Sequence, residues 1–347
     1  MSRFSDRLSF GGLLALCLFV GSLSAAAQEA PVTLLRTVPL PGIVGDFDHL
    51  TVDFKRHHLF VSAEVHQSIE VFDLESGKHL KSVGGFKTPH AIAFAAAKDE
   101  LMVADGGDST LVLVSGETLQ RVGQVPLIAG TAGGGDSPDA ATYDPANQLY
   151  YIGNGGESAG TPDSVISIYS VMKGEIIGKI AIPGNNVESM AVDNAYHRLY
   201  VNIRDKQEAG VVDLVSRKVI ATWTAPGMKG NTALSFNEAS QQLFVAGRNP
   251  GIFHVFDMTG KEVSRLQCVD KNDDMTWDPA MKRVYISGSQ GLSIFHQDAT
   301  LKYREIANLP TNGGKTSLYV PALKQFYVIH PKTDVDGAAL LVYRVNP

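Results

Sequence analysis

The chain has 347 residues, with 30 Lys and Arg against 36 Asp and Glu, for a formal net charge of −6. This acidic balance, without a run of basic residues, argues against a nucleic-acid-binding protein, because such proteins concentrate Lys and Arg against phosphate. Of the two cysteines, Cys17 lies in an apolar N-terminal segment and only Cys268 lies in the rest of the chain. No intramolecular disulfide is therefore expected, and Cys268 is predicted to be a small buried hydrophobe.

Residues 1–27 have the pattern of a secretory signal peptide. Arg3 and Arg7 precede a short apolar run over residues 13–20, and Ala25-Ala26-Ala27 supplies the small residues that signal peptidase requires. The run is shorter than the roughly 20 apolar residues of a transmembrane anchor. Cys17 within this run leaves a lipoprotein as the alternative. We predict cleavage after Ala27 and a periplasmic or secreted protein without a membrane anchor.

The remainder, residues 28–347, contains a unit that repeats seven times. Each unit has a short run of β-branched and aromatic residues: Leu59-Phe60-Val61, Leu101-Met102-Val103, Leu149-Tyr150-Tyr151, Leu199-Tyr200-Val201, Leu243-Phe244-Val245, Val284-Tyr285-Ile286 and Phe326-Tyr327-Val328. Successive runs start 42, 48, 50, 44, 41 and 42 residues apart. A strand ending in Asp or Asn, such as Leu50–Asp53, precedes the run, and two more strands follow it, as in Ile69–Asp73 and 174–180. Four strands per unit at this period predict an all-β fold, a single-domain seven-bladed β-propeller.

The two ends of the repeat region complement each other. The last unit stops after its third strand, Leu340–Arg344, whereas the segment Leu34–Gly42 resembles the fourth strand of another unit, Ile177–Gly184. We predict that the mature N-terminal strand pairs with the last blade, which closes the ring and removes an exposed sheet edge.

The repeated strand, of which Leu199-Tyr200-Val201-Asn202 is the clearest copy, resembles that of the YVTN-type, YncE-like family of secreted bacterial β-propellers. The resemblance covers residues 33–347. It implies seven blades and a periplasmic or secreted location, but the motif is a packing pattern and assigns no activity.

Three loop insertions are predicted to fall on one face of the ring. Residues 130–136 and 153–160 produce the two long spacings, and 332–337 extend the corresponding loop of the last unit. Loops that grow on a single face favour that face as the functional one, although tolerated surface insertions are an equal alternative. The glycine runs are not phosphate-binding loops, since neither leads into a helix or ends in Gly-Lys-Ser/Thr.

Alignment of the units on their first strands places one residue of each at the mouth of the central channel. These ring residues are Asp48, His90, Asp139, Glu188, Thr232, Asp273 and Lys315, with His49 and Asp274 directly after two of them. Converging carboxylates and imidazoles suit a divalent metal or acid–base chemistry, and the candidate metal ligands are Asp48, His90, Asp139 and Glu188. Lys315 argues against a simple cation cage. A ring of mixed sign suits a polar or zwitterionic small molecule or a peptide equally well, and a solvated polar ring is the alternative without function.

Further charged residues follow the second strands near the same mouth: Glu64, His66, Asp105, Asp108, Arg204, Asp205, Arg248 and His330. Arg204 and Arg248 are candidates for gripping a carboxylate or phosphate of a ligand. The motifs Cys-x-x-Cys-His and His-Glu-x-x-His are absent, so neither covalent haem attachment nor this type of zinc-dependent catalysis has a sequence signature.

Two functions follow from these observations. The first is an exported binding or scaffold protein, expected to be a monomer, that presents the channel mouth to a small ligand, a peptide or an envelope protein. The second is a metal-dependent hydrolase or lyase, lactonase-like by analogy of fold alone, in which the acidic and His residues of the ring supply metal ligands and acid or base. The missing catalytic motifs favour the first.

Overall fold

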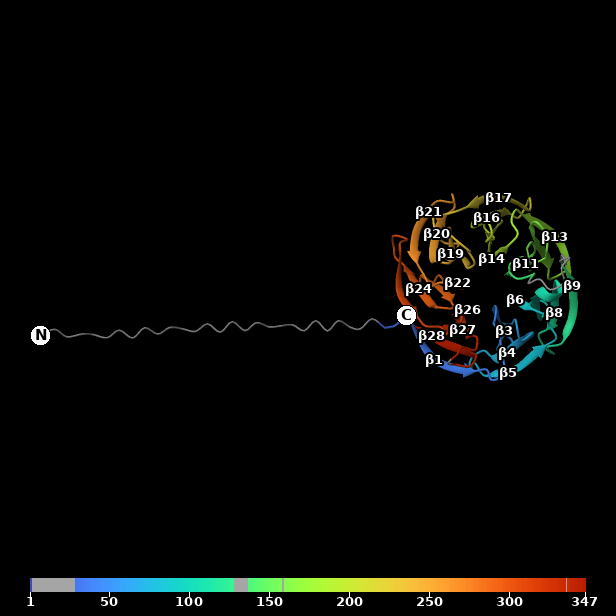
Figure 1. The fold of residues 1–347 in the computed structure, drawn as a ribbon, viewed down its shortest axis with the longest axis horizontal. Helices are drawn as coiled ribbons and strands as arrows, with labels where there is room; N and C mark the ends of the chain where they lie inside the picture. The colour runs from blue at the N-terminus through green and yellow to red at the C-terminus, as the bar shows by residue number, and fades with distance from the viewer. Residues whose placement is uncertain (2–28, 128–136, 158, 335) are drawn as a thin grey trace.

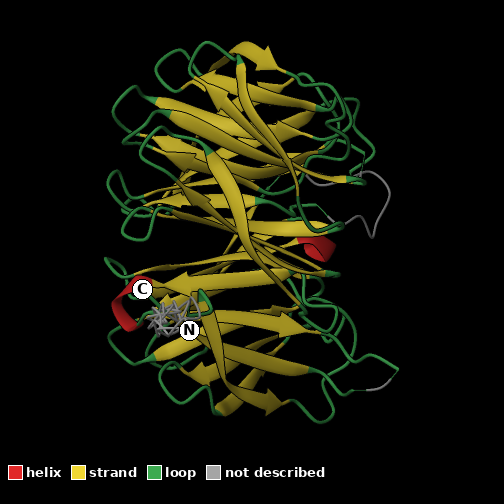
Figure 2. Cartoon of the chain, turned by 90° about the vertical axis from the view of Figure 1, so that its left-hand side faces the viewer, coloured by secondary structure: helices red, strands yellow, loops and turns green. Residues whose placement is uncertain are grey.

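The computed structural model describes residues 1, 29–127, 137–157, 159–334 and 336–347. Seven four-stranded antiparallel sheets stand around a central axis (Figure 1). Seen from the side, the strands cross a thick disc between two faces formed by loops (Figure 2). The chain is a seven-bladed β-propeller, as the repeat predicts.

Two sequence predictions lie outside the described residues, and two others lie outside them in part. The signal peptide after Met1 and its cleavage site lie outside them, as does the insertion at 130–136. The two other insertions are described except for Ser158 and Val335.

Each blade runs from an innermost first strand to an outermost fourth strand. The first strands are β2 (Leu50–Asp53), β6 (Pro89–Ala95), β10 (Ala141–Asp144), β14 (Val187–Asp193), β18 (Leu234–Asn237), β22 (Asn272–Asp278) and β26 (Thr316–Val320). The second strands are β3 (His58–Ala63), β7 (Glu100–Asp105), β11 (Leu149–Gly155), β15 (Arg198–Ile203), β19 (Gln242–Arg248), β23 (Arg283–Gly288) and β27 (Gln325–His330). Each first strand contacts the first strand of the next blade, so these strands surround the channel.

The outer half of each blade follows the same order. The third strands are β4 (Ser68–Asp73), β8 (Thr110–Ser115), β12 (Ser164–Ser170), β16 (Glu208–Asp213), β20 (Gly251–Asp257), β24 (Gly291–Gln297) and β28 (Ala339–Val345). The fourth strands are β5 (His79–Gly84), β9 (Arg121–Pro126), β13 (Glu175–Ile182), β17 (Lys218–Trp223), β21 (Glu262–Gln267), β25 (Tyr303–Leu309) and, from the other end of the chain, β1 (Val32–Pro39). Two 3-10 turns, η1 (Gly106–Asp108) and η2 (Pro321–Leu323), complete the described elements. No helix in the described part of the chain is long and apolar enough to cross a bilayer.

The described residues form seven hydrophobic core clusters, one between each pair of neighbouring blades. The buried aromatic ring of the repeated motif, Tyr150, Tyr200, Tyr285 or Tyr327 in four blades, lies in these clusters. This packing explains the motif, because the middle residue of each second strand buries a large side chain against the adjacent sheet. Cys268, 6% exposed, belongs to the cluster between blades five and six, and burial raises the pKa of its thiol, as expected for an inert hydrophobe.

The turns between first and second strands share two features. In five blades the Asp or Asn that ends the first strand accepts a backbone N–H two or three residues later, as Asp53 does from Lys55 and Asp193 does from Tyr196. One non-glycine residue in each of these seven turns has a positive φ: His57, Asp99, Gln148, His197, Gln241, Lys282 and Lys324. Side-chain acceptors of this kind stabilise tight turns, which accounts for the recurring Asp and Asn in the repeat.

The N-terminal strand closes the ring as predicted. β1 pairs antiparallel with β28, from Val32 opposite Val345 to Pro39 opposite Ala339; the two strands run side by side in Figure 1. Asn346 adds two hydrogen bonds between the ends of the described chain: its side-chain amide donates to the carbonyl of Ala30 at 2.8 Å and to Thr33 Oγ1 at 2.7 Å. The predicted strand boundaries, 34–42, are shifted by two to three residues from those observed.

Candidate functional site

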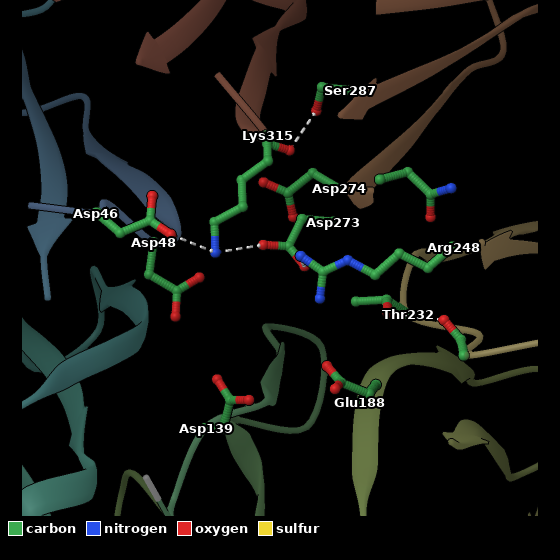
Figure 3. Close-up of polar contacts among 12 residues, drawn as sticks. Asp46, Asp48, Asp139, Glu188, Thr232, Arg248, Asp273, Asp274, Ser287 and Lys315 are labelled. Atoms are coloured by element: carbon green, nitrogen blue, oxygen red, sulfur yellow. Dashed lines mark hydrogen bonds and ion pairs between the residues drawn. The ribbon is translucent and has the colours of Figure 1, made fainter. Parts of the chain in front are cut away.

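One mouth of the channel collects all seven ring residues. They line a cavity of about 170 Å³ together with His49, Glu64, Ser189, Arg204 and Arg248. Figure 3 shows the carboxylates of Asp48, Asp139, Glu188 and Asp273 pointing toward the middle of this mouth, with Lys315 reaching in from the last blade. The volume is far larger than one water molecule needs, so the mouth has room for a small ligand.

The seven ring residues meet at the mouth because they occupy equivalent places in blades that repeat around one axis. His90, Glu188 and Asp273 lie in the first strands of their blades, whereas Asp48, Asp139, Thr232 and Lys315 lie just before them. Three second strands hold the next ring residue through an equivalent side chain. Ser62 donates to the carbonyl of His90 at 2.6 Å, Asn202 to that of Thr232 at 2.8 Å and Ser287 to that of Lys315 at 3.0 Å. The mouth is therefore tied to the rigid sheets.

We expect Ser62→Ala to destabilise the fold by about 1–2 kcal/mol, because the buried carbonyl of His90 loses its side-chain donor. Chemical denaturation at pH 7 measures the change in the free energy of unfolding. Ser62→Thr, which keeps a hydroxyl, is the matched control. Equal stability of the alanine variant and the wild type would mean that this bond does not hold the ring residue.

The basic groups on one side of the mouth already have carboxylate partners. Lys315 Nζ lies 3.1 Å from Asp46 Oδ2 and 3.0 Å from Asp273 Oδ2, and Arg248 lies 3.5 Å from Asp273 Oδ1. Burial would lower the pKa of Lys315, but Asp273, Asp48 and Asp46 raise it above its ordinary value. Lys315 is therefore a fixed positive charge that neutralises this side.

His49 connects the first and sixth blades. Its Nδ1 lies 3.0 Å from Asp274 Oδ1 and its Nε2 lies 3.4 Å from Asp48 Oδ1. Burial opposes protonation, but the carboxylates of Asp48 and Asp274 raise the pKa of His49 well above its ordinary value. Asp274 also accepts the backbone N–H of Ser317 at 2.8 Å, which fixes its orientation.

His90 lies between two carboxylates of neighbouring blades. Its Nδ1 is 2.9 Å from Asp48 Oδ2 and 3.5 Å from Asp139 Oδ1. Burial would lower the pKa of His90, but the hydrogen bond to Asp48 and the charge of Asp139 raise it to about 9. Burial would likewise raise the pKa of Asp48, yet His49 and His90 hold it well below its ordinary value. His90 itself is 4% exposed, and its Nε2 has no hydrogen-bond partner among the described residues.

Glu188 forms the best-defined ion pair of the opposite side. Its Oε1 accepts from Arg204 Nη1 at 2.6 Å. Burial and the charge of Asp139 nevertheless raise the pKa of Glu188 to about 8, because Arg204 compensates only part of the cost of desolvating the carboxylate. The pKa of Asp139 is also raised, by burial first and by Asp48 among its neighbours.

The negative charges of the Asp139 and Glu64 carboxylates are the least neutralised in the mouth. The Asp139 side chain is 44% exposed, and its nearest positive group is His90 at 3.5 Å. The side chain of Glu64 has no hydrogen bond or ion pair within the described ranges, and burial raises its pKa. We call the part of the mouth that Asp139, Glu64 and His90 line its least compensated arc. A positively charged group would be stabilised most there.

The structure brings some of the outer predicted residues to the cavity and leaves others away from it. Arg204, Arg248 and Glu64 line it, whereas His66, Asp105, Asp108, Asp205 and His330 are not among its lining residues. Asp105 instead accepts the backbone N–H groups of Lys87 and Thr88, which is a structural role.

The sequence reasoning placed Glu64, Arg204 and Arg248 near this mouth but did not identify Asp46. The first three share a position five residues after the start of their repeated run. Asp46, the partner of Lys315, has no counterpart in other blades and carries no such signal. The insertion after β11 lies at the same mouth, since Glu157 N donates to Asn185 O, in the loop before β14, at 2.7 Å.

Comparisons with known proteins bear on the fold. No protein-family model and no curated protein matches the chain. A chain of the crystal structure of the mitotic checkpoint complex is similar at a TM-score of 0.71 and 16% identity, over 96% of this chain and 100% of that one. A chain of Kuenenia stuttgartiensis hydrazine synthase is similar at a TM-score of 0.68 and 16% identity, over 86% and 99%. At this identity the likeness shows the propeller fold and carries no activity across.

Proposed function

We propose that this protein is an exported binding protein whose channel mouth holds a small polar ligand through a positively charged group. The observation that carries the proposal is the uneven pairing of charges. Lys315, Arg204 and Arg248 each lie within 3.5 Å of a carboxylate, whereas among the described residues Asp139 is paired only with His90, at 3.5 Å, and Glu64 has no ion pair. A cation of the ligand therefore adds a second partner to Asp139 and a first one to Glu64.

The magnitude is sufficient for selective binding. Two unit charges about 4 Å apart attract by about 4 kcal/mol at the effective dielectric of a protein surface cleft. An anionic ligand gains less, because each basic group would have to leave a carboxylate that it already contacts. Zwitterions or amines are therefore favoured over simple anions.

The wider setting belongs to the same proposal. The pattern of residues 1–27 supports export to the periplasm or medium, and the repeated strand supports membership of the YVTN-type, YncE-like group. A propeller disc with an open polar mouth is also suited to docking a peptide or an envelope protein as a scaffold, and the acidic net charge of −6 disfavours nucleic acid. We take the working state to be a monomer without a membrane anchor.

The ligand site can be tested by thermal shift with a panel of probes at pH 7. We expect lysine, ethanolamine or spermidine to raise the melting temperature of the wild type, since a ligand that binds only the folded state stabilises it. Citrate and inorganic phosphate should not. The shift should fall at least severalfold in Asp139→Asn, because the exposed carboxylate of the mouth is removed.

Glu117→Gln and Glu238→Gln are the matched controls, since both side chains are exposed in turns on the opposite face. Equal amine shifts in Asp139→Asn and in these controls would place the ligand elsewhere. A panel in which only the anions stabilise the protein would reverse the sign of the proposed ligand.

The second candidate, a metal-dependent hydrolase or lyase, is favoured by one observation. Carboxylates and an imidazole cluster within this same mouth. A metal ion held there would supply Lewis-acid chemistry or an activated water, and the described residues would hold and orient it.

A further inference from the structure

Three side chains that can ligate a metal converge on the least compensated arc of the mouth. One ring nitrogen of His90 and one carboxylate oxygen each of Asp48 and Glu64 all lie within 4.8 Å of one another. They come from three places in two adjacent blades, namely the loop before β2, the turn after β3 and strand β6. Neighbouring inner strands therefore hold the three groups at fixed separations.

A second observation points to a ligand at this cluster. His90 is 4% exposed, and its Nε2 has no hydrogen-bond partner within the described residues, although its Nδ1 lies 2.9 Å from Asp48. A buried ring nitrogen without a partner is costly. The unpaired side chain of Glu64 lines the same cavity.

We propose that Asp48, Glu64 and His90 bind a divalent transition-metal ion such as Zn²⁺ or Mn²⁺. The inference rests on the proposed function, because the metal is then the positively charged group that the mouth accepts. Mixed imidazole and carboxylate donors suit these ions, whereas Ca²⁺ prefers six to eight oxygens. Three protein ligands leave a coordination position open to water or to a further ligand from the cavity.

The neighbouring cations do not block such an ion. Lys315 is held by Asp46 and Asp273 at 3.1 and 3.0 Å, and His49 is held by Asp274 at 3.0 Å, closer than its 3.4 Å contact with Asp48. Asp139, 3.5 Å from His90, adds a further negative charge beside the cluster. The local balance of fixed groups on this arc is therefore acidic.

The experiment uses the whole exported chain, stripped with chelator and titrated with Zn²⁺, Mn²⁺ and Ca²⁺ by calorimetry. We expect one Zn²⁺ or Mn²⁺ per chain and much weaker Ca²⁺ binding. Glu64→Gln should weaken binding by at least about tenfold. This variant keeps the fold, because the Glu64 side chain makes no other bond in the described ranges, and Glu238→Gln on the opposite face is its control. Substitution with Co²⁺ gives a second readout, since its visible absorption should report a nitrogen ligand that His90→Asn removes.

The possible outcomes separate this inference from the proposed function. Absence of Zn²⁺ and Mn²⁺ binding while amines still shift the melting temperature overturns the metal site and leaves the ligand site standing. Metal binding that is equally strong in Glu64→Gln and the wild type also overturns it. A protein that responds to neither metals nor amines contradicts both.

Discussion

Deletion of residues 28–39 should cause the largest loss of stability of any small change in this protein. The deletion removes β1, and β28 then loses the whole pairing from Val345 to Ala339. It also removes the carbonyl of Pro31, which accepts from Asn346 N at 2.9 Å and from the buried Arg283 at 3.3 Å. We expect the melting temperature to fall by about 10 °C or more, with association through the exposed sheet edge.

Two further measurements test this prediction if the chain that lacks residues 28–39 does not fold. Asn346→Ala removes the side-chain hydrogen bonds to Ala30 and Thr33, and the one that Asn346 Oδ1 accepts from Arg344 Nε at 3.0 Å, and should cost about 2–3 kcal/mol. A synthetic peptide of residues 28–42, added to the deleted chain, should restore the melting temperature by strand addition. A deleted chain that melts like the wild type would show that the ring does not depend on this closure.

Glu188→Gln should change how stability depends on pH. The pKa of Glu188 is raised by burial and by Asp139 to about 8 in the folded state, from an ordinary value of 4.5. Between these values the folded protein keeps a proton that the unfolded chain has lost, so this group makes stability fall as the pH rises from about 4.5 to 8. Removing the ionisable carboxyl therefore stabilises the protein at pH 8–9, by on the order of 3 kcal/mol, and changes little at pH 5.

The groups that face Glu188 decide the size of this effect. Arg204 lowers the pKa through its charge and its hydrogen bond, while Asp139, in the adjoining third blade, and Asp273, in the sixth, raise it. Gln retains an oxygen for Arg204, so the variant tests the charge and not the bond. Urea denaturation at pH 5 and pH 8.5, with Glu238→Gln as the exposed control, measures the difference. A stability gain that is the same at both pH values would contradict the prediction.

The fold could be predicted because each local pattern is repeated. The alternation of the second strands, the Asp or Asn before each turn and the aromatic ring of the motif are all short-range features, and seven copies reinforce one another. The closing strand could also be predicted, since Leu34–Gly42 has the pattern of a fourth strand but is not preceded by the other three strands of a blade. The tertiary structure moved only its boundaries, to Val32–Pro39.

Rotational repetition likewise let the sequence identify the residues that surround the mouth. All seven aligned positions, from Asp48 to Lys315, line the cavity. Alignment assigns a residue to a ring because equivalent positions in identical sheets lie at equal distances from one axis. It carries no information about which ring members touch each other.

Pairing was decided only in three dimensions. Asp46 pairs with Lys315 although they are far apart in the sequence, and Glu64 has no ion pair in the described part of the chain although it lies in the same cavity. These contacts depend on side-chain reach and on the order of blades around the channel, which differ from blade to blade. The sequence by itself thus determined the ring and its members. The tertiary structure decided which charges are neutralised, because the attraction between two charges depends on distances of a few ångströms that no repeat pattern encodes.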